Sequence, residues 1–302
     1  MDGTSTASPG TEQQLIGGVA YGQSYRERRP ARPLAEVVSS VWVQQVPPGA
    51  APYLHRNVPN GSVEVRCGLG QVPRVVGPLT RPLTEVLSPG STVVGLRFRP
   101  GAASGVLGIP VSELADLVVD ADELWGRSAV AAGERIAAAA GPGVAASALQ
   151  DAVVGRLAGA DSPDPLVGEA VRRLMPWRVG DLGSVRASLW VSERQFRRRC
   201  LSAVGVPPKA LQRMLRFQVF LARAQFAMWR RDGLASEGLA RLAADCGYAD
   251  QAHLTRECVR LAGAPPLAFL RQTEQSCGRA GHDHQVSFAP WLPARQGGRF
   301  VQ

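Results

Sequence analysis

Residues 247–270 read GYADQAHLTRECVRLAGAPPLAFL, and this stretch decides the fold of the C-terminal part of the chain. Just before it, four apolar residues recur at the spacing of one helical face, which predicts a short helix. They are Leu239, Leu242, Ala243 and Cys246. Gly247 follows, where a residue that tolerates positive φ turns the chain at low cost. The pattern predicts a helix, a tight turn and a second helix.

The second helix is predicted to begin after Asp250, whose carboxylate can accept the unpaired N–H groups of the first turn. Its buried face carries Leu254, Cys258 and Leu261. Its opposite side carries Gln251, Ala252, Thr255, Arg256 and Arg260. A buried face backed by Gln, Thr and Arg is typical of a helix that enters the major groove of DNA. The alternative is that the two arginines form only a solvated helix face.

These residues resemble the AraC/XylS family of bacterial transcription regulators. The matching elements are Gly247-Tyr248, Gln251, His253-Leu254-Thr255-Arg256, Gly263, the pair Pro265-Pro266 and Phe269. The resemblance implies an all-α DNA-binding domain with two helix-turn-helix units. A first copy of the unit is therefore expected upstream.

Residues 182–206, LGSVRASLWVSERQFRRRCLSAVGV, supply that copy. Ser192 is predicted to cap its second helix, with Gln195 as the capping-box partner three residues on. Phe196, Cys200 and Val204 are expected to face inward. The residues expected to face DNA are Arg194, Gln195, Arg197 and Arg198 in this unit, and Gln251, Ala252, Thr255 and Arg256 in the other.

The first copy departs from the family pattern. Trp190 occupies a turn where a small residue is usual, and Gly183 replaces a better helix former. Cys200 and Cys258 both stand where an aromatic residue is usual. The first unit is therefore expected to be less stable or less specific than the second. Its run of arginines at 197–199 is adjacent to no acidic residue in the sequence, which favours a DNA-facing role over a solvated one.

Between the copies, residues 208–229 are long enough for one helix. A helical stripe runs through Leu211, Leu215, Ala222, Phe226 and Trp229. At 1.5 Å per residue this helix spans about 33 Å, close to one turn of B-DNA, so two recognition helices could enter successive major grooves. We expect five connector arginines to meet phosphates between them. They are Arg213, Arg216, Arg223, Arg230 and Arg231.

The formal charge of +9 is concentrated in this region. Residues 163–274 carry 18 basic and 10 acidic residues, whereas residues 1–162 carry 13 basic and 14 acidic ones. The tail from residue 275 adds three Arg and one Asp. A basic excess confined to one domain indicates a polyanionic partner for that domain. Arg outnumbers Lys 33 to 1, which we attribute mainly to a GC-rich genome.

The N-terminal half reads as short strands separated by Pro-Gly and Asn-Gly turn signals. The predicted strands are residues 37–43, 62–68, 74–77, 83–87 and 92–98. Helical patterning follows at 101–124 and 129–158, and a loop at 160–163. Residues 55–65 and 95–103 resemble a sensor-type domain of actinobacterial AraC-type proteins. This second resemblance implies a small barrel that binds an effector or mediates dimerisation.

The chain is thus expected to be α+β. A disordered leader (1–15) would precede a β-rich, barrel-like sensor or oligomerisation domain that ends in helices (16–160). The all-α domain with its two helix-turn-helix units and long connecting helix would cover 163–274, and an irregular tail 275–302.

Enzymatic and metal-binding readings are disfavoured. A β-barrel oxygenase needs two or three histidines, and residues 1–162 contain only His55. No Gly-rich phosphate loop, GxSxG or HExxH motif occurs. The five cysteines form no CxxC pair, which is the usage of a reducing cytoplasm. Cys277, His282 and His284 have only loose metal-ligand spacing. We expect no cofactor, no metal, no membrane span and a cytoplasmic location.

The sequence therefore predicts a DNA-binding transcription regulator that acts on double-stranded DNA and RNA polymerase, under control of a small-molecule effector of the N-terminal domain. Two alternatives stay open: a regulator switched by a partner protein, and a nonspecific DNA-binding protein. A homodimer also stays open. The effector, the operator, the target genes and the sign of regulation are not encoded in these patterns.

Overall fold

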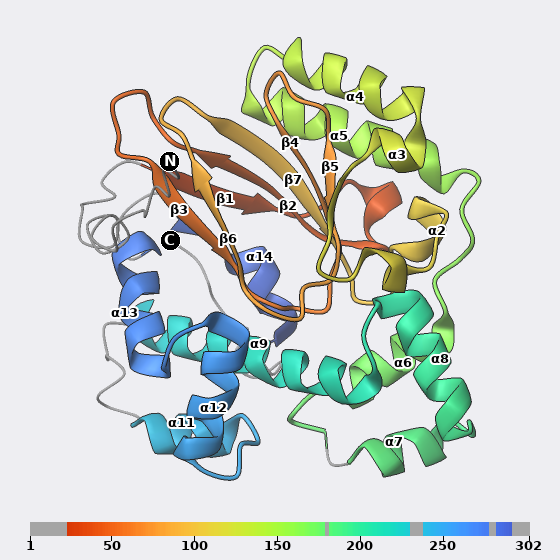
Figure 1. Cartoon of the computed structure of the whole chain (residues 1–302), viewed down its shortest axis with the longest axis vertical. Coiled ribbons are helices and arrows are strands. Elements are labelled where there is room, and N and C mark those ends of the chain that lie inside the picture. The colour runs from red at the N-terminus through yellow and green to blue at the C-terminus, as the bar shows by residue number, and fades with distance from the viewer. Residues whose placement is uncertain (1–22, 179–180, 230–237, 278–281, 292–302) are drawn as a thin grey trace, which may run out of the picture.

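The structure is a computed structural model that describes residues 23–178, 181–229, 238–277 and 282–291. The predicted leader at 1–15 and Arg230 and Arg231 of the connector lie outside these ranges. Figure 1 shows a β-rich part in the upper half of the view and a helical part in the lower half. The molecule therefore has the α+β architecture that the sequence predicts.

The N-terminal part is built on a seven-stranded sheet with the order β8-β5-β4-β7-β2-β1-β9, and on a two-stranded sheet β3-β6. The strands are β1 (Ser24–Arg28), β2 (Val38–Gln45), β3 (Tyr53–Asn57), β4 (Glu64–Gly68), β5 (Arg74–Val76), β6 (Leu83–Leu87), β7 (Thr92–Phe98), β8 (Val118–Asp120) and β9 (His282–Asp283). Neighbours are antiparallel except for the parallel pair β1–β9. In the described part of the chain β8 and β9 form the two edges of the large sheet, so the expected barrel is an open sheet with a second small sheet beside it.

The five expected strands are present as β2, β4, β5, β6 and β7. Strands β1, β3 and β8 were not expected, because SYRER, YLHRN and VVD are short and SYRER is rich in charge. The region 101–124, expected to be helical, contains only short pieces. They are α2 (Ser104–Leu107), the 3-10 turn η2 (Val111–Leu114), β8 and α3 (Asp122–Trp125).

One face of the large sheet is apolar and packs on helices. Val65, Val94 and Leu96 are fully buried in a core that includes Leu149 and Val153 of α5 (Pro142–Leu157). Helix α4 (Arg127–Ala137) packs on α5, and both lie against the upper part of the sheet in Figure 1. Alanines on the inner side of α5 let its backbone approach the strands, so this face is filled by a dense aliphatic core.

The opposite face of the sheet is polar although it is buried. Strand alternation places Glu27, Glu64 and Arg97 there, and Arg97 Nε donates to Glu64 Oε1 at 2.7 Å. Arg66 of β4 forms an ion pair with Glu85 of β6 and so connects the two sheets. Buried charges remain stable only when they are paired, and these groups form such pairs.

The C-terminal part is a set of helices arranged along α9 (Pro208–Trp229). Before α9 come α6 (Pro165–Arg173), α7 (Leu182–Ser188) and α8 (Glu193–Val204). After it come α11 (Leu239–Asp245), α12 (Gln251–Ala262) and α13 (Pro266–Cys277). Asp164 caps α6 by accepting from the N–H of Leu166 at 2.9 Å, just after the expected interdomain loop. Figure 1 shows α7 and α8 at one end of α9 and α11 and α12 at the other.

The tail was expected to be irregular, yet residues 282–291 contain three short elements. After β9 come α14 (Gln285–Phe288) and the 3-10 turn η3 (Ala289–Trp291). Helix α14 packs on β1 and β2, and η3 packs on α9. The pairing with β1 supplies backbone partners that local sequence signals do not reveal, which is why the Pro and Gly content misled the sequence-based expectation.

Candidate nucleic-acid interface

The first helix-turn-helix unit consists of α7, a turn and α8. Asp181 caps α7, and Ser192 and Gln195 form the expected capping box at the start of α8. Phe196, Cys200 and Val204 are buried as expected. The turn between the helices places Trp190 at φ 54° with 94% of its surface exposed. A positive φ is strained for a large side chain, so the turn of the first unit carries the cost that the sequence indicated.

The outer surface of α8 is lined with arginines. Arg194, Arg197 and Arg198 are exposed, and so is Gln195, whose side-chain oxygen accepts the Ser192 N–H at 3.2 Å. The expectation that the run 197–199 has no acidic partner is wrong for Arg199. Its Nη1 lies 3.0 Å from Asp164 Oδ1 at the start of α6, and only the fold brings the two together. Three arginines of α8 thus remain directed to solvent, and the fourth joins α8 to α6.

The second unit consists of α11, the turn at Gly247 and α12. Gly247 has φ 76°, and Asp250 caps α12 by accepting from the N–H of His253 at 2.6 Å. Leu254, Cys258 and Leu261 are buried as expected. The four residues expected to read DNA lie on the outer side of α12: Gln251, Ala252 and Arg256 are exposed and Thr255 is half-buried. The turn of this unit uses glycine for the positive φ and is free of the strain found at Trp190.

The described arginines of α9 do not match the phosphate-binding role expected of them. Arg213 Nε lies 3.6 Å from Glu257 Oε2 on α12, and Arg223 Nη1 lies 3.6 Å from Asp245 Oδ2 on α11. The guanidinium of Arg216 lies 5.6 Å from the centre of the Tyr248 ring, a cation–π contact. All three hold the second unit on α9. Sequence reasoning missed this role because their partners are remote in sequence.

The N-terminal part also contacts the second unit. Arg56 on β3 donates to the Gln272 side chain of α13 at 2.9 Å and to the Ala262 carbonyl at the end of α12 at 3.4 Å. A cation at this position suits the partial negative charge of a helix C-terminus. The Gln218 side chain of α9 donates to the Pro59 carbonyl at 3.0 Å. The loop after β3 is thereby attached to the axis of the helical part.

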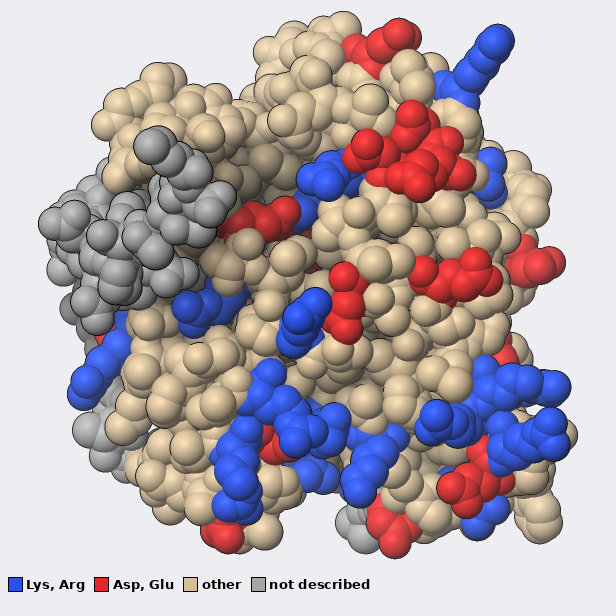
Figure 2. Space-filling view, viewed as in Figure 1, with Lys and Arg blue, Asp and Glu red and all other residues tan. Residues whose placement is uncertain are grey.

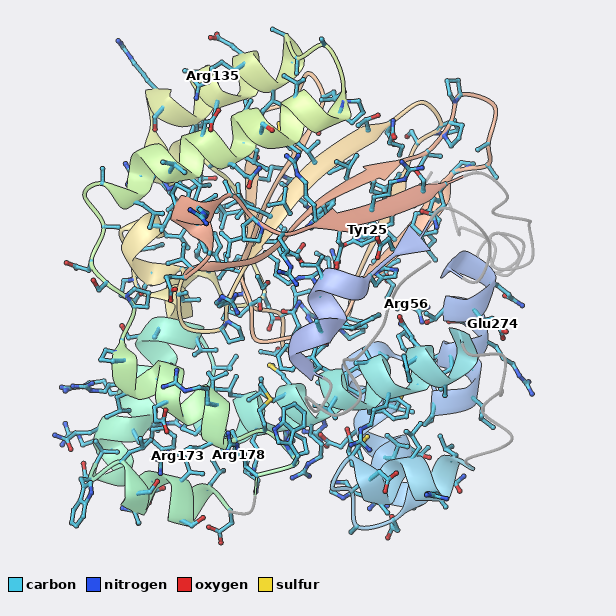
Figure 3. All side chains as sticks on the ribbon, turned by 180° about the vertical axis from the view of Figure 1, so that it is seen from behind. Tyr25, Arg56, Arg135, Arg173, Arg178 and Glu274 are labelled. Carbon is cyan, nitrogen blue, oxygen red and sulfur yellow. The ribbon has the colours of Figure 1, made fainter. Side chains whose placement is uncertain are left out.

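A hollow with a volume of about 670 Å³ lies beside the first unit, between α6 and α7. Arg172, Arg173 and Arg178 line it together with Ser184 and Ser188, and Figure 3 labels Arg173 and Arg178 there. Glu169 forms ion pairs with Arg172 and Arg173, and these hydrogen bonds hold the pKa of Glu169 below its usual value. The carboxylate offsets one of the three positive charges, so the hollow has a basic lining.

Charge is divided between the two halves of the surface. Figure 2 shows Lys and Arg gathered over the helical half, at the bottom of the view, and Asp and Glu mostly over the N-terminal half. The basic residues at the bottom belong to the same region that has the charge excess in the sequence. The exposed faces of α8 and α12 therefore lie on a basic surface.

The described thiols are buried and unreactive in character. Burial raises the pKa of Cys200, Cys246 and Cys258 to about 12 and that of Cys67 to about 11. They act as small apolar core residues. Within the described ranges, no group of three or more His, Cys, Asp or Glu side chains is placed to hold a metal ion. No helix in those ranges is both long and apolar enough to cross a membrane.

Comparison with known proteins gives one family model and two solved structures. Residues 26–120 match the family described as a domain of unknown function, DUF6597. This match covers most of the sheet and none of the helical part. No curated protein matches. ToxT from Vibrio cholerae O395 is 11% identical with a TM-score of 0.41, over 82% of this chain and 98% of that one. An apo single-residue variant of ToxT from Vibrio cholerae strain SCE256 is also 11% identical, with a TM-score of 0.39. That similarity covers 84% of this chain and 98% of the ToxT chain.

Proposed function

We propose that this protein is a transcription regulator of the AraC/XylS type that binds double-stranded DNA through α8 and α12. The observation that carries the proposal is the pairing of two helix-turn-helix units at the two ends of one helix of 22 residues. At about 33 Å this helix is close to one turn of B-DNA, so α8 and α12 can enter successive major grooves on one side of the duplex.

The exposed side chains of α8 and α12 differ in chemistry, so we propose different roles in DNA binding for the two helices. On α12, Gln251 suits adenine, Arg256 suits guanine, and Ala252 and the Thr255 methyl suit the thymine methyl group. On α8, Arg194, Arg197 and Arg198 can bind guanine or phosphate. Phosphate contacts position a protein on DNA, whereas base contacts select the sequence. We infer that α12 supplies most of the sequence discrimination and α8 most of the sequence-independent affinity.

The basic hollow between α6 and α7 extends this surface. Its arginines lie next to the first unit, and Arg178 has no acidic partner among the described residues. Neutralising each phosphate contributes a slope of about −0.9 to the plot of log affinity against log salt. A protein that uses α8, α12 and this hollow together is therefore expected to bind DNA with a steep salt dependence.

The N-terminal half is proposed to control this activity by binding a small-molecule effector, in a cytoplasmic protein that acts on RNA polymerase. Its contacts with α9, α12 and α13 through Pro59 and Arg56 give a physical route from that half to the recognition helices. Control by a partner protein is the competing proposal. A thermal-shift screen of metabolites on the full chain, followed by DNA titration with and without each stabilising compound, separates the two, since an effector must both bind the protein and change its affinity for DNA.

The direct test of DNA binding is selection of bound duplexes from a random pool by the full chain, followed by titration at several salt concentrations. We expect an enriched motif and an affinity that falls steeply with salt. Arg135, exposed on α4 in the N-terminal half, offers a charge-matched control, because Arg135→Ala should leave binding unchanged. Salt-dependent binding without an enriched motif would favour a nonspecific DNA-binding protein. A folded chain that binds no duplex would refute the proposal.

A further inference from the structure

The polar face of the large sheet is covered by the chain's own tail. Strand β9 adds to the edge of the sheet beside β1, with His282 opposite Tyr25 and Asp283 opposite Arg26. Helix α14 then packs on β1 and β2. Figures 1 and 3 both show α14 between the sheet and α9, and Figure 3 labels Tyr25 beside it. We call residues 282–291 the strap.

The strap makes two kinds of contact with this face. The His284 ring stacks on Tyr25 with 4.6 Å between ring centres and 23° between planes. The backbone N–H of Ser287 donates to Glu27 Oε2 at 2.7 Å. The other oxygen of Glu27 accepts from the Tyr25 hydroxyl at 2.8 Å. A planar nitrogen ring and an N–H donor to a buried carboxylate are thus the chemistry that the strap supplies.

Tyr25, Glu27 and Trp42 lie beneath the strap, and we call these three residues the floor. Trp42 stacks on Tyr25 with 5.8 Å between ring centres. Its indole lies so close to the backbone of Gly95 that a Cβ at that position would overlap the ring, so glycine is required for Trp42 to lie there. Trp42 is 3% exposed, and its Nε1 has no hydrogen-bond acceptor among the described residues. The floor therefore keeps a buried donor that the strap does not match.

The charges around the floor select against anions. The Glu27 side chain is fully buried, Arg97 lies 3.7 Å from it, and Arg97 is shared with Glu64. Two carboxylates and one guanidinium leave an excess of negative charge. Burial raises the pKa of Glu27, against the lowering effects of Arg97 and of the hydrogen bonds from Tyr25 and Ser287. A ligand here must bring an N–H or a positive charge to the carboxylate.

We propose that the strap is a tethered occupant of a ligand site on this face, and that the ligand which displaces it is a small planar nitrogen heterocycle, neutral or cationic, with an N–H donor. Such a molecule would stack on Tyr25, donate to Glu27 and offer a ring acceptor to Trp42. The strap supplies the first two of these contacts and leaves the third unmade.

Displacement would have a consequence at the other end of the strap. Trp291 packs against the apolar clusters of both helix-turn-helix units. A ligand that removes the strap from Tyr25 would loosen this contact and alter how the two units are held. This consequence rests on the proposed function, whereas ligand binding itself does not.

The experiment measures binding of 2-aminobenzimidazole to the full chain by calorimetry. This probe is planar and carries N–H donors suited to a carboxylate, and in its neutral form it keeps one ring nitrogen that can accept a hydrogen bond from Trp42 Nε1. We expect at least five-fold tighter binding to His284→Ala than to the native chain, because the substitution weakens the competing strap. The matched control is Val286→Ala, a half-buried strap residue outside these contacts, which should bind as the native chain does.

Two variants test the floor. Glu27→Gln should weaken probe binding at least ten-fold, and Tyr25→Leu should also weaken it, because it removes the stacking ring and the hydroxyl that donates to Glu27. Folding of each variant is checked by circular dichroism. Benzoate, planar but anionic, should not bind. The proposal is overturned if the probe does not bind, if His284→Ala binds it no more tightly, or if both floor variants bind it normally. Loss of DNA binding with intact probe binding would count against the proposed function alone.

Discussion

The two helix-turn-helix units have the same outline but are held in place by different forces. The first unit is attached through packing: α8 lies on η2 and α2 of the N-terminal part, with Gly205 in close contact with Pro78 and Val111. The second unit packs on α9 through an apolar cluster that includes Phe217 and Leu254, and arginines add ion pairs and hydrogen bonds to this packing. Arg213 and Arg223 pair with its acidic residues, and Arg56 meets the end of α12. The second unit is therefore expected to be the more sensitive of the two to screening of charge.

The glycines that end α8 and α12 test this difference between the two units. Gly205 and Gly263 have φ 83° and 75°, so alanine strains both backbones. A Cβ at 205 would also lie 2.5 Å from Pro78 Cγ and 2.9 Å from the Val111 carbonyl oxygen, whereas a Cβ at 263 would lie 3.5 Å from Pro82 Cγ. We expect Gly205→Ala to lower the free energy of unfolding by about 3 kcal/mol and Gly263→Ala by about 1 kcal/mol.

Urea unfolding followed by circular dichroism measures both free energies. Each variant is the other's control, because the chemical change and the backbone conformation are the same. Equal losses would mean that the close contact of Gly205 with the N-terminal part contributes nothing to stability.

A second test of the difference between the two units removes one arginine from α8 and one from α12. Arg256→Ala is expected to weaken binding to a selected DNA site by about 2 kcal/mol while binding to random DNA changes little, since Arg256 lies beside Thr255 on the side of α12 that we propose reads bases. Arg197→Ala on α8 is expected to weaken binding to both kinds of DNA by similar, smaller amounts and to reduce the salt slope. Fluorescence anisotropy measures all four affinities. If Arg256→Ala weakens both DNAs equally, Arg256 contacts phosphate only.

The parts of this comparison that follow from local sequence could be predicted. The connector occurs at 208–229 as its stripe of apolar residues indicated, and the inward residues of α8 and α12 are buried. Periodicity fixes which side of a helix is buried wherever that helix lies. The capping box at Ser192 and the positive φ at Trp190 and Gly247 are equally local, because they depend on residues within one turn.

Partners that are distant in sequence could not be predicted. Arg199 seemed free of acidic neighbours until the fold brought Asp164 to it, and Arg213 and Arg223 seemed free to meet phosphate. The tail gave no sign of a strand, because the partner of β9 in the described part of the chain is β1, which is remote in sequence. Sequence shows which residues point outward on a helix but not which other element lies there.

A third test removes the hydrogen bonds that connect Arg56 of the N-terminal part to the second unit. Arg56→Ala deletes the donor to Gln272 and to the Ala262 carbonyl, and we expect a loss of about 1 kcal/mol in stability. Hydrogen exchange should increase in α12 and α13 but not in α8. Arg56→Lys, which keeps the charge but loses the planar geometry, should give an intermediate loss. Faster exchange in α8 as well would show that the two units open together.

The last and smallest effect uses the buried thiols as reporters of each unit. Cys200 faces the core of the first unit and Cys258 that of the second, and burial raises the pKa of both to about 12, so each reacts only when its unit opens. Raising ionic strength to 1 M shortens the Debye length to about 3 Å and screens the partly exposed ion pairs. Two or three such pairs contribute about 1 kcal/mol together, which corresponds to a roughly five-fold change in the population of the open state.

We therefore expect salt to accelerate alkylation of Cys258 about five-fold and that of Cys200 less than two-fold, because α8 has the single ion pair Arg199–Asp164 in the described part of the chain and is otherwise held by packing. Iodoacetamide labelling at fixed pH, read out by peptide mass spectrometry in a Cys277→Ser background, gives both rates in one sample. A small-molecule thiol corrects for the effect of salt on the reaction, and Cys67 in the N-terminal core is the internal reference. Arg213→Gln should raise the low-salt rate at Cys258 toward its high-salt value and leave Cys200 unchanged. Equal acceleration at both thiols would mean that the arginines of α9 do not distinguish the two units.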